Sequence, residues 1–300
     1  MMQRNSPMNR RTFVKTSSAF AAMAGSTVSG DTASPRKIRK GIMYATIEIK
    51  ASVMDQFKAV KTAGFDGVEP MSHMSQAEVL DAFKETGMSA ASVCCATHWK
   101  NPLSDPSAEV RAVGLRGLEQ ALQDAKAYGA TSVLLVPAVV SKQVSYKDAY
   151  VRSQAEIRKA LPMAQELGVK IAVENVWNHF LMSPLEAARY IDEFESNAIG
   201  WHFDVGNVIT FGWPDQWIHI LGKRIQKLHI KEYSLAKRDK TGPSSGFDVK
   251  FLEGSNDWPA IMKALDEVGY QGWGIAEQPG ADSPDGLKDL SDRMTKIFAS

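Results

Sequence analysis

Short apolar runs and longer amphipathic segments take turns along the chain from Lys40 to the C-terminus. Apolar runs of roughly four to eight residues indicate buried strands, and longer segments with apolar residues every three or four positions indicate helices. The segment 107–128 illustrates the helical spacing, with apolar side chains at Val110, Leu118 and Leu122. Eight strand signals, each followed by a helix signal, are found in this way. The repeat predicts a parallel sheet with right-handed crossovers.

The boundaries of these elements follow from the apolar runs and the Ser, Gly and Pro residues around them. The predicted strands cover residues 41–45, 65–69, 89–97, 132–136, 169–174, 199–204, 225–229 and 272–277. The predicted helices cover residues 53–63, 75–86, 107–128, 146–167, a segment from 183 onward, 215–221, 256–269 and 284–299. Pro162 lies inside the fourth helix and should kink or split it. The longest connection without a pattern, residues 233–255, is predicted to be a lid or a substrate-specificity segment.

Eight strand–helix repeats predict an α/β fold, a single-domain (β/α)8 TIM barrel over residues 36–300. A six-stranded doubly wound sheet is the alternative. We disfavour it because no Gly-x-Gly-x-x-Gly turn follows the first strand and because the later strands end in residues that bind metals.

The first 35 residues are a separate object, predicted to be a twin-arginine signal peptide and linker. Residues 9–15 read Asn-Arg-Arg-Thr-Phe-Val-Lys, which matches the export motif, and Ala22-Met23-Ala24 fits an Ala-x-Ala cleavage site. An accidental Arg-Arg pair in a disordered tail is the alternative. The apolar run behind the arginines is too short to span a membrane. The sequence therefore predicts a periplasmic or otherwise exported protein with no membrane contact after cleavage.

Composition narrows the class of protein. The chain has 300 residues, 44% hydrophobic content and a formal net charge of +1, which together predict a soluble globular protein. This balance leaves no excess of positive charge for binding nucleic acid. Cys94 and Cys95 are adjacent in an apolar strand, so they are predicted to be small core residues rather than a disulfide framework. A protein without structural disulfides can fold before export, in agreement with the twin-arginine motif.

Four strands in the second half of the chain end at a residue type that binds metals, namely Glu174, Asp204, His229 and Glu277. A single acid or histidine at a strand end is more often a surface residue or a helix cap. Four of them on the later strands of one barrel are expected to converge above its mouth. Three carboxylates and one imidazole, with no thiolate, suit one divalent ion: Mn²⁺, Mg²⁺, Co²⁺ or Zn²⁺.

Such an ion can chelate two adjacent oxygens of a polyol or a ketose. It would then stabilise the enediolate that forms when a C–H group next to a carbonyl loses its proton. Glu174 and Glu277 come from the fifth and eighth predicted strands, so they approach the ion from opposite sides. If both face the substrate, one can remove a proton from one face and the other can return a proton to the opposite face, which is epimerisation.

The sequence around these residues resembles the xylose-isomerase-like TIM barrels, the sugar phosphate isomerase/epimerase group. The resemblance runs from about Lys40 to the C-terminus and rests on Val-Glu-Asn-Val-Trp-Asn at 173–178, Phe-Asp-Val-Gly-Asn at 203–207, Leu-His-Ile-Lys-Glu-Tyr at 228–233 and Ala-Glu-Gln-Pro-Gly at 276–280. It implies that Glu174, Asp204, His229 and Glu277 bind one divalent metal. It also implies that the two glutamates are the acid/base pair of ketose 3-epimerases.

Two positions depart from the pattern of the 3-epimerases that act on free ketoses. Three residues after Asp204, their substrate-contacting His is replaced by Asn207, and in the segment after His229 their Arg is replaced by Ala236. Lys237 or Arg238 could substitute for that Arg. The endonuclease IV branch of the superfamily uses a three-zinc centre with many histidines. A chain with six histidines and nearly balanced charge argues against it.

Further side chains at the expected active face are predicted to bind the substrate. His98 follows the third strand, Glu69 closes the second, and Trp177 could stack on a sugar ring. Lys231 shares the inward side of His229, while Asn207 and Arg238 complete the predicted set. Each has an alternative as a loop or core residue. His202, on the inward side of Asp204, fits a core histidine as well as a functional one.

These residues predict a metal-dependent isomerase or epimerase that acts on a ketose or a related keto-sugar. Export favours an unphosphorylated substrate, because sugar phosphates are cytoplasmic metabolites. One alternative is a lyase or dehydratase acting on a keto-polyol such as an inosose, or on a 3-keto-glycoside, since the same enediolate can expel a β-substituent. The other is a non-catalytic sugar-binding barrel. The sequence leaves room for a homo-oligomer.

Overall fold

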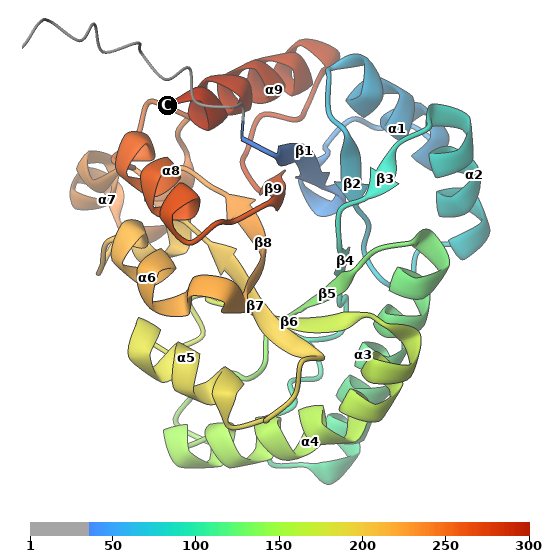
Figure 1. Ribbon diagram of the computed structural model, residues 1–300, viewed down its shortest axis with the longest axis vertical. Helices are drawn as coiled ribbons and strands as arrows, with labels where there is room; N and C mark the ends of the chain where they lie inside the picture. The colour runs from blue at the N-terminus through green and yellow to red at the C-terminus, as the bar shows by residue number, and fades with distance from the viewer. Residues whose placement is uncertain (1–35) are drawn as a thin grey trace, which may run out of the picture. The chain divides into compact units, whose positions relative to one another are not determined.

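The computed structural model describes residues 36–300, so the predicted signal segment 1–35 lies outside the described residues. Within that range, nine parallel strands form a nearly closed barrel, and the helices between them surround it (Figure 1). The strands are β1 (Ile38–Met43), β2 (Gly67–Glu69), β3 (Ser89–Ala90), β4 (Val93–Cys94), β5 (Ser132–Leu135), β6 (Lys170–Glu174), β7 (Ile199–Asp204), β8 (Ile225–Ile230) and β9 (Gly272–Ala276). The predicted single-domain (β/α)8 barrel is confirmed.

The prediction of one continuous strand over residues 89–97 is wrong. It is broken at Ala91 and Ser92 into β3, which pairs with β2, and β4, which pairs with β5. The sheet order β3-β2-β1-β9-β8-β7-β6-β5-β4 therefore starts and ends on two halves of one run, and eight strand positions make the barrel. Residues after β2 reach across the break, because Ser72 donates its backbone N–H to the Cys94 carbonyl at 2.8 Å.

Nine α-helices accompany these strands in the described part of the chain: α1 (Val53–Thr62), α2 (Gln76–Thr86), α3 (Ala108–Tyr128), α4 (Tyr146–Leu167), α5 (Pro184–Asp192), α6 (Pro214–Leu221), α7 (Leu235–Thr241), α8 (Trp258–Glu267) and α9 (Pro284–Ala299). Serine side chains cap several of them. Ser107 Oγ accepts from the Val110 N–H at the start of α3, which satisfies a backbone donor that has no partner within the helix. The predicted split at Pro162 is wrong, since α4 is one helix of 22 residues in which buried Leu161 and Ala164 pack into the core on both sides of the proline.

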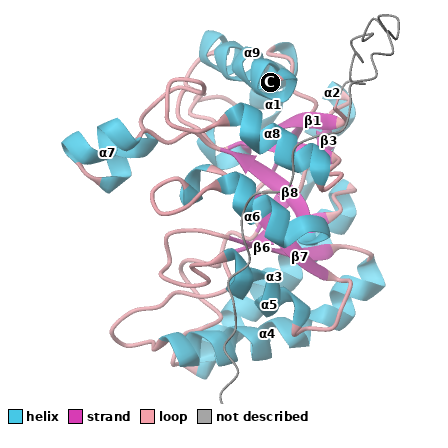
Figure 2. Ribbon diagram, turned by 60° about the vertical axis from the view of Figure 1, so that its left-hand side comes forward, coloured by secondary structure: helices cyan, strands magenta, loops and turns pink. Residues whose placement is uncertain are grey.

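Residues 233–255, in which the sequence shows no helix or strand pattern, do contain regular structure. They contain α7 and a 3-10 helix at Pro243–Phe247, joined at Gly242 with a φ of 107° that favours glycine. The helix α7 has no buried residue, so it lacks the apolar periodicity by which a helix is recognised in a sequence. It stands clear of the ring formed by the other helices (Figure 2).

The core lies mainly between the strands and the surrounding helices, where Phe57, Leu118, Ile171 and Ile261 are among the fully or nearly fully buried side chains. Removing one such side chain from water contributes roughly 1.5–3 kcal/mol to folding. Both cysteines are buried and free, as predicted. Within residues 36–300, no helix combines the length and the apolar character needed to cross a membrane.

Candidate metal centre and active site

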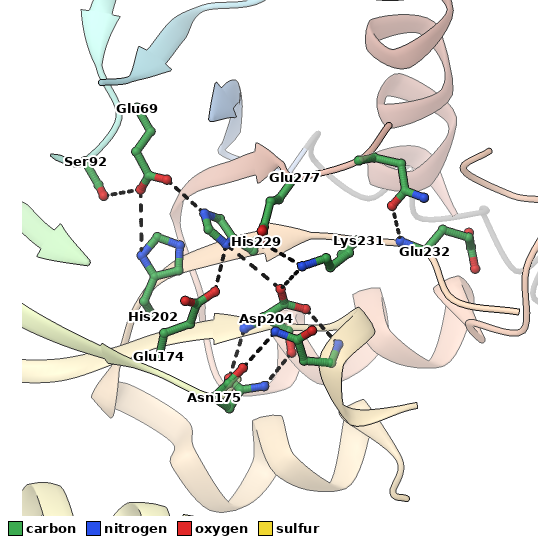
Figure 3. A network of polar contacts seen from close by, with 12 residues as sticks. Glu69, Ser92, Glu174, Asn175, His202, Asp204, His229, Lys231, Glu232 and Glu277 are labelled. Carbon is green, nitrogen blue, oxygen red and sulfur yellow. Dashed lines mark hydrogen bonds and ion pairs between the residues drawn. The ribbon is translucent and has the colours of Figure 1, made fainter. Parts of the chain in front are cut away.

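The four predicted ligands meet at the end of the barrel where the strands finish. Glu174 ends β6, Asp204 ends β7, His229 lies near the end of β8, and Glu277 directly follows β9. Adjacent parallel strands put Asp204 and His229 in register, and one donor atom from each of the four residues lies within 4.8 Å of the others. The Nδ1 atom of His229 is 2.9 Å from a carboxylate oxygen of Glu174 and 2.9 Å from one of Glu277 (Figure 3).

Burial makes it unfavourable for all the carboxylates of this group to carry a negative charge when no cation is near. Removal from water raises the pKa of Asp204 to about 7 and also raises that of Glu174. Burial alone would raise the pKa of Glu277 too, but Lys231 and His229 outweigh it and hold this pKa well below its usual range. Lys231 Nζ lies 2.9 Å from Glu277 and 3.3 Å from Asp204. One lysine and one imidazole face three carboxylates, so a divalent cation would relieve their repulsion.

The donor set fits a divalent metal ion. Ligand bonds of roughly 2.0–2.3 Å allow donor atoms on opposite sides of an ion to lie about 4–4.6 Å apart, which agrees with the 4.8 Å limit on the four donor atoms. Oxygen donors with one imidazole nitrogen suit Mn²⁺, Mg²⁺, Co²⁺ or Zn²⁺. Glu174, Asp204, His229 and Glu277 are therefore the residues that would hold it.

Asn175, which the sequence analysis did not single out, fixes the geometry of Asp204. Its side-chain amide donates to the Asp204 carbonyl at 2.7 Å and accepts from the Asp204 N–H at 3.0 Å. Asn207 joins the same network, because its backbone N–H donates to a carboxylate oxygen of Asp204 at 2.8 Å and its side chain donates to the Asn175 carbonyl at 2.9 Å. A signal for Asn175 existed, since it directly follows the ligand Glu174.

A second group of potential ligands lies deeper in the barrel. Glu69, His202 and His229 also offer donor atoms within 4.8 Å of one another, and His229 belongs to both groups. Its Nε2 atom lies 2.9 Å from a carboxylate oxygen of Glu69, on the side of the ring opposite Glu174 and Glu277 (Figure 3). Glu69, which was predicted to bind the substrate, is completely buried, contacts His229 and does not line the cavity beside the four ligands.

A cavity of about 220 Å³ opens next to the four predicted ligands. It is lined by Met43, Cys94, His98, Trp99, Leu134, Glu174, Val176, Trp177, Asn207, His229, Lys231, Phe247 and Glu277. Of the predicted substrate-binding residues, the structure brings together four here: His98, Trp177, Asn207 and Lys231. Trp177 is held in place by its indole N–H, which donates to the Asn207 carbonyl at 3.0 Å.

His98 presents a hydrogen-bond donor to this cavity. Burial lowers its pKa to about 4, so the ring is neutral near neutral pH. Its Nδ1 atom accepts from the Val136 N–H at 3.2 Å, which leaves the proton of the neutral ring on Nε2.

Arg238, the remaining residue of the predicted substrate-binding set, lies elsewhere. Its guanidinium group contacts the Thr210 carbonyl at 3.3 Å and Asp239 at 2.8 Å, and the side chain lines a separate pocket beside α6 and α8. Phe247 reaches the catalytic cavity from the same long segment, and its ring centroid lies 4.9 Å from Lys231 Nζ. Sequence reasoning missed Phe247 because nothing in the pattern placed its helical turn over the barrel.

Comparison with known proteins places the chain in a family. The sequence profile described as xylose isomerase-like TIM barrel matches residues 57–297, most of the described chain. The chain belongs to the xylose isomerase-like TIM barrel family. The resemblance inferred from the strand ends is thus confirmed at the level of the family.

Three proteins that resemble this chain are named as sugar epimerases. The chain is 25% identical over 285 residues to L-ribulose-5-phosphate 3-epimerase UlaE of Escherichia coli K12, covering 87% of this chain and 96% of that protein. It superposes on D-psicose 3-epimerase with D-fructose at a TM-score of 0.72 and 19% identity, covering 86% and 98%. With 3-keto-D-glucoside 4-epimerase YcjR of E. coli the TM-score is 0.74 at 20% identity, covering 88% and 100%.

Proposed function

We propose that the protein is a divalent-metal-dependent isomerase or epimerase that acts on a ketose or a related keto-sugar. The observation that carries the proposal is the pair Glu174 and Glu277, which reach the same imidazole nitrogen of His229 from strand positions separated by β7 and β8. Both carboxylates also line the cavity. The relatives that are sugar epimerases by name support the same class of enzyme.

In the proposed reaction, negative charge on the substrate is stabilised, and the two glutamates transfer protons. The ion supplies, when bound, Lewis-acid stabilisation of the negative charge that develops as a carbon next to a carbonyl loses its proton. One carboxylate of the pair Glu174 and Glu277 accepts that proton from one face of the substrate, and the other delivers a proton to the opposite face. Their origin on β6 and β9, two strands separated by β7 and β8, supports this two-base arrangement.

Other cavity residues would orient the sugar. The Nε2 proton of His98 is a neutral donor for a hydroxyl or carbonyl oxygen, and Lys231 offers a charged donor between Asp204 and Glu277. The ring of Trp177 gives an apolar wall on which the C–H face of a sugar can pack. The aromatic and apolar lining limits the water around the reacting carbon.

Hydrogen exchange at carbon tests this function directly. Incubation of metal-loaded protein with a panel of ketoses and keto-polyols in D₂O should place deuterium at the carbon next to the carbonyl, and mass spectrometry would detect it together with the epimer. The exchange should disappear in chelator-treated protein. A panel in which no sugar exchanges, although the protein holds one equivalent of metal, would contradict the proposal.

A second candidate function is elimination or epimerisation of a 3-keto-glycoside. An apolar pocket of about 230 Å³ shares Val176, Trp177 and Asn207 with the catalytic cavity, and Phe180 and Trp217 are among its other lining residues. Such a pocket suits an apolar substituent attached to the sugar at the metal centre. A 3-keto-glycoside with an aryl substituent would then react faster than the free keto-sugar, and release of the substituent would identify elimination.

We further propose export by the twin-arginine route, with a substrate that is not phosphorylated. The proposal rests on the motif at residues 9–15 and the Ala-x-Ala pattern that follows it. Assembly into a homo-oligomer stays a prediction, to be checked by sedimentation.

The double substitution Arg10→Lys with Arg11→Lys should leave an uncleaved precursor in the cytoplasm, because the transporter reads the arginine pair as an address and not as charge. Fractionation followed by mass spectrometry of the N-terminus measures this. Mature protein outside the cytoplasm in normal amounts would refute the export route. The same pair of substitutions should not change the metal content of the purified protein.

A further inference from the structure

Glu69 and His202 surround the inner side of His229 in a part of the barrel that the proposed reaction does not use. Glu69 and His202 are completely buried, and His229 is 1% exposed. One carboxylate oxygen of Glu69 lies 2.9 Å from His229 Nε2, and the other accepts a hydrogen bond from the Ser92 hydroxyl (Figure 3). His202 lies against the ring of His229, with ring centroids 4.2 Å apart.

Two arrangements of this group can be distinguished. In the first, Glu69, His202 and His229 hold a second metal ion. In the second, Glu69 binds the Nε2 proton of His229 and thereby determines which ring nitrogen is free to bind the ion of the active site. The two arrangements differ in the protonation of His229 and in the number of ions bound.

Chemical considerations favour the second arrangement. A second ion on Nε2, together with one on Nδ1, would require His229 to lose both ring protons. The group would also offer only three ligands, and one of its two imidazoles would be shared with the first site, whereas closed zinc sites normally have four. A hydrogen bond from Nε2–H to Glu69 needs one proton only. It leaves the Nδ1 lone pair free for the ion, on the side of the ring where Glu174 and Glu277 lie.

We infer that Glu69 is the positioning residue of the metal centre: it accepts the Nε2 proton of His229, fixes the ring in the tautomer that binds metal through Nδ1, and raises the basicity of that nitrogen. Metal-binding histidines generally donate their other N–H to such a partner, and losing the partner typically weakens metal binding 10–100-fold. The inference deepens the proposed function and rests on it, since it presumes the ion held by Glu174, Asp204, His229 and Glu277.

The contact also links distant parts of the sequence. Glu69 ends β2, and His229 lies on β8, three strand positions away around the barrel. The His229 ring reaches across the interior, so a residue from the first half of the chain orients a ligand of the metal centre that the second half builds. Ser92, in the break between β3 and β4, holds the other oxygen of Glu69 and keeps the carboxylate facing His229.

Metal affinity tests the inference. Chelator-treated wild type and Glu69→Gln would be titrated with Zn²⁺ or Co²⁺ against a chromophoric chelator. The wild type should bind one equivalent, and Glu69→Gln should bind the same single equivalent 10–100-fold more weakly. Turnover of Glu69→Gln should recover towards the wild-type kcat when metal is saturating, because the residue does not line the cavity. Wild-type affinity in a folded Glu69→Gln protein would overturn the inference.

Two controls make the result specific. Glu232→Gln is the same change at a carboxylate that is 1% exposed but binds the Leu252 N–H and the Trp258 indole, and its metal affinity should stay unchanged. His202→Phe keeps a ring beside His229 and removes two nitrogens to which no residue in the range 36–300 forms a hydrogen bond. It should also bind one equivalent at wild-type affinity. Two equivalents in the wild type and one in His202→Phe would establish the second ion instead.

A measurement on the wild type covers the case in which Glu69→Gln does not fold. Long-range ¹H–¹⁵N correlation of the Zn²⁺-loaded, ¹⁵N-labelled protein reports the state of each ring nitrogen. His229 should show a metal-bound Nδ1 and a protonated Nε2, and any other pattern would overturn the inference. If the wild type binds no metal at all, the proposed function fails; if it binds metal but Glu69→Gln binds equally well, only the role of Glu69 fails.

Discussion

Replacing Glu277 with glutamine is expected to abolish turnover and leave the fold intact. The amide has nearly the same volume as the carboxylate, but it cannot accept a proton and it binds a divalent ion poorly. Glu277 is the carboxylate that contacts both Lys231 and His229 at 2.9 Å, so its charge also balances the Lys231 ammonium group. Loss of general acid/base catalysis alone lowers the rate by roughly 100-fold or more.

Steady-state kinetics with the substrate found by deuterium exchange would measure this loss, and circular dichroism would verify the fold. Retention of more than about a tenth of the activity would exclude the acid/base role. Because Glu277 is also a predicted ligand, the metal content of Glu277→Gln must be determined in parallel. The variant Glu232→Gln serves as the control for replacing a buried glutamate, since its carboxylate lies outside the catalytic cavity.

The second large effect is expected for His229→Ala, which should release the metal and abolish activity. The three carboxylates Glu174, Asp204 and Glu277 would then face one another with one nitrogen ligand fewer. An ion that binds only the native state stabilises it by about 2.7 kcal/mol at a free concentration of 100 times Kd. The melting temperature of His229→Ala should therefore fall toward that of chelator-treated wild type and should not respond to added metal.

His219→Ala is the matched control for this experiment. His219 lies on α6, and its Nε2 atom contacts Glu267 at 2.7 Å on the surface, about half exposed. Its removal should keep a full equivalent of metal and nearly all activity, because surface pairs of this kind contribute little to stability. If His229→Ala kept the metal and His219→Ala lost it, both the ligand assignment and the strand register beneath it would be wrong.

The ends of the later strands could be predicted because two rules combine there. Parallel strands of a barrel finish at one edge, and side chains alternate between inside and outside, so Glu174, Asp204 and His229 had to converge once their strands were recognised. Glu69 illustrates what the pattern could not supply. Its position at the end of the second strand placed it at the expected active face, but its depth depends on the register with β1 and on how far the His229 ring reaches, which only the three-dimensional packing determines.

Arg238 and α7 illustrate a second limit. The orientation of α7 follows from the turn at Gly242 and from hydrogen bonds such as that of Ser234 N–H to the Gly246 carbonyl, at 2.8 Å. These interactions are local and carry no apolar periodicity, so no sequence pattern indicated that Phe247 would cover the cavity while Arg238 turned away. Similarly, the shift of register at Trp201 and His202 between β7 and β8 leaves no signature in the sequence.

The ammonium group of Lys231 has a consequence for how the protein acquires its metal. Positioned between Asp204 and Glu277, it neutralises part of the carboxylate charge before any ion arrives, so we expect the barrel to fold without metal. The ion would then enter a finished site. Affinities of such sites follow the same order of metals almost regardless of the protein, and selectivity in a cell depends largely on which metals are available. Under the proposed export, the identity of the metal would therefore be decided by the compartment in which the folded chain first meets a free ion.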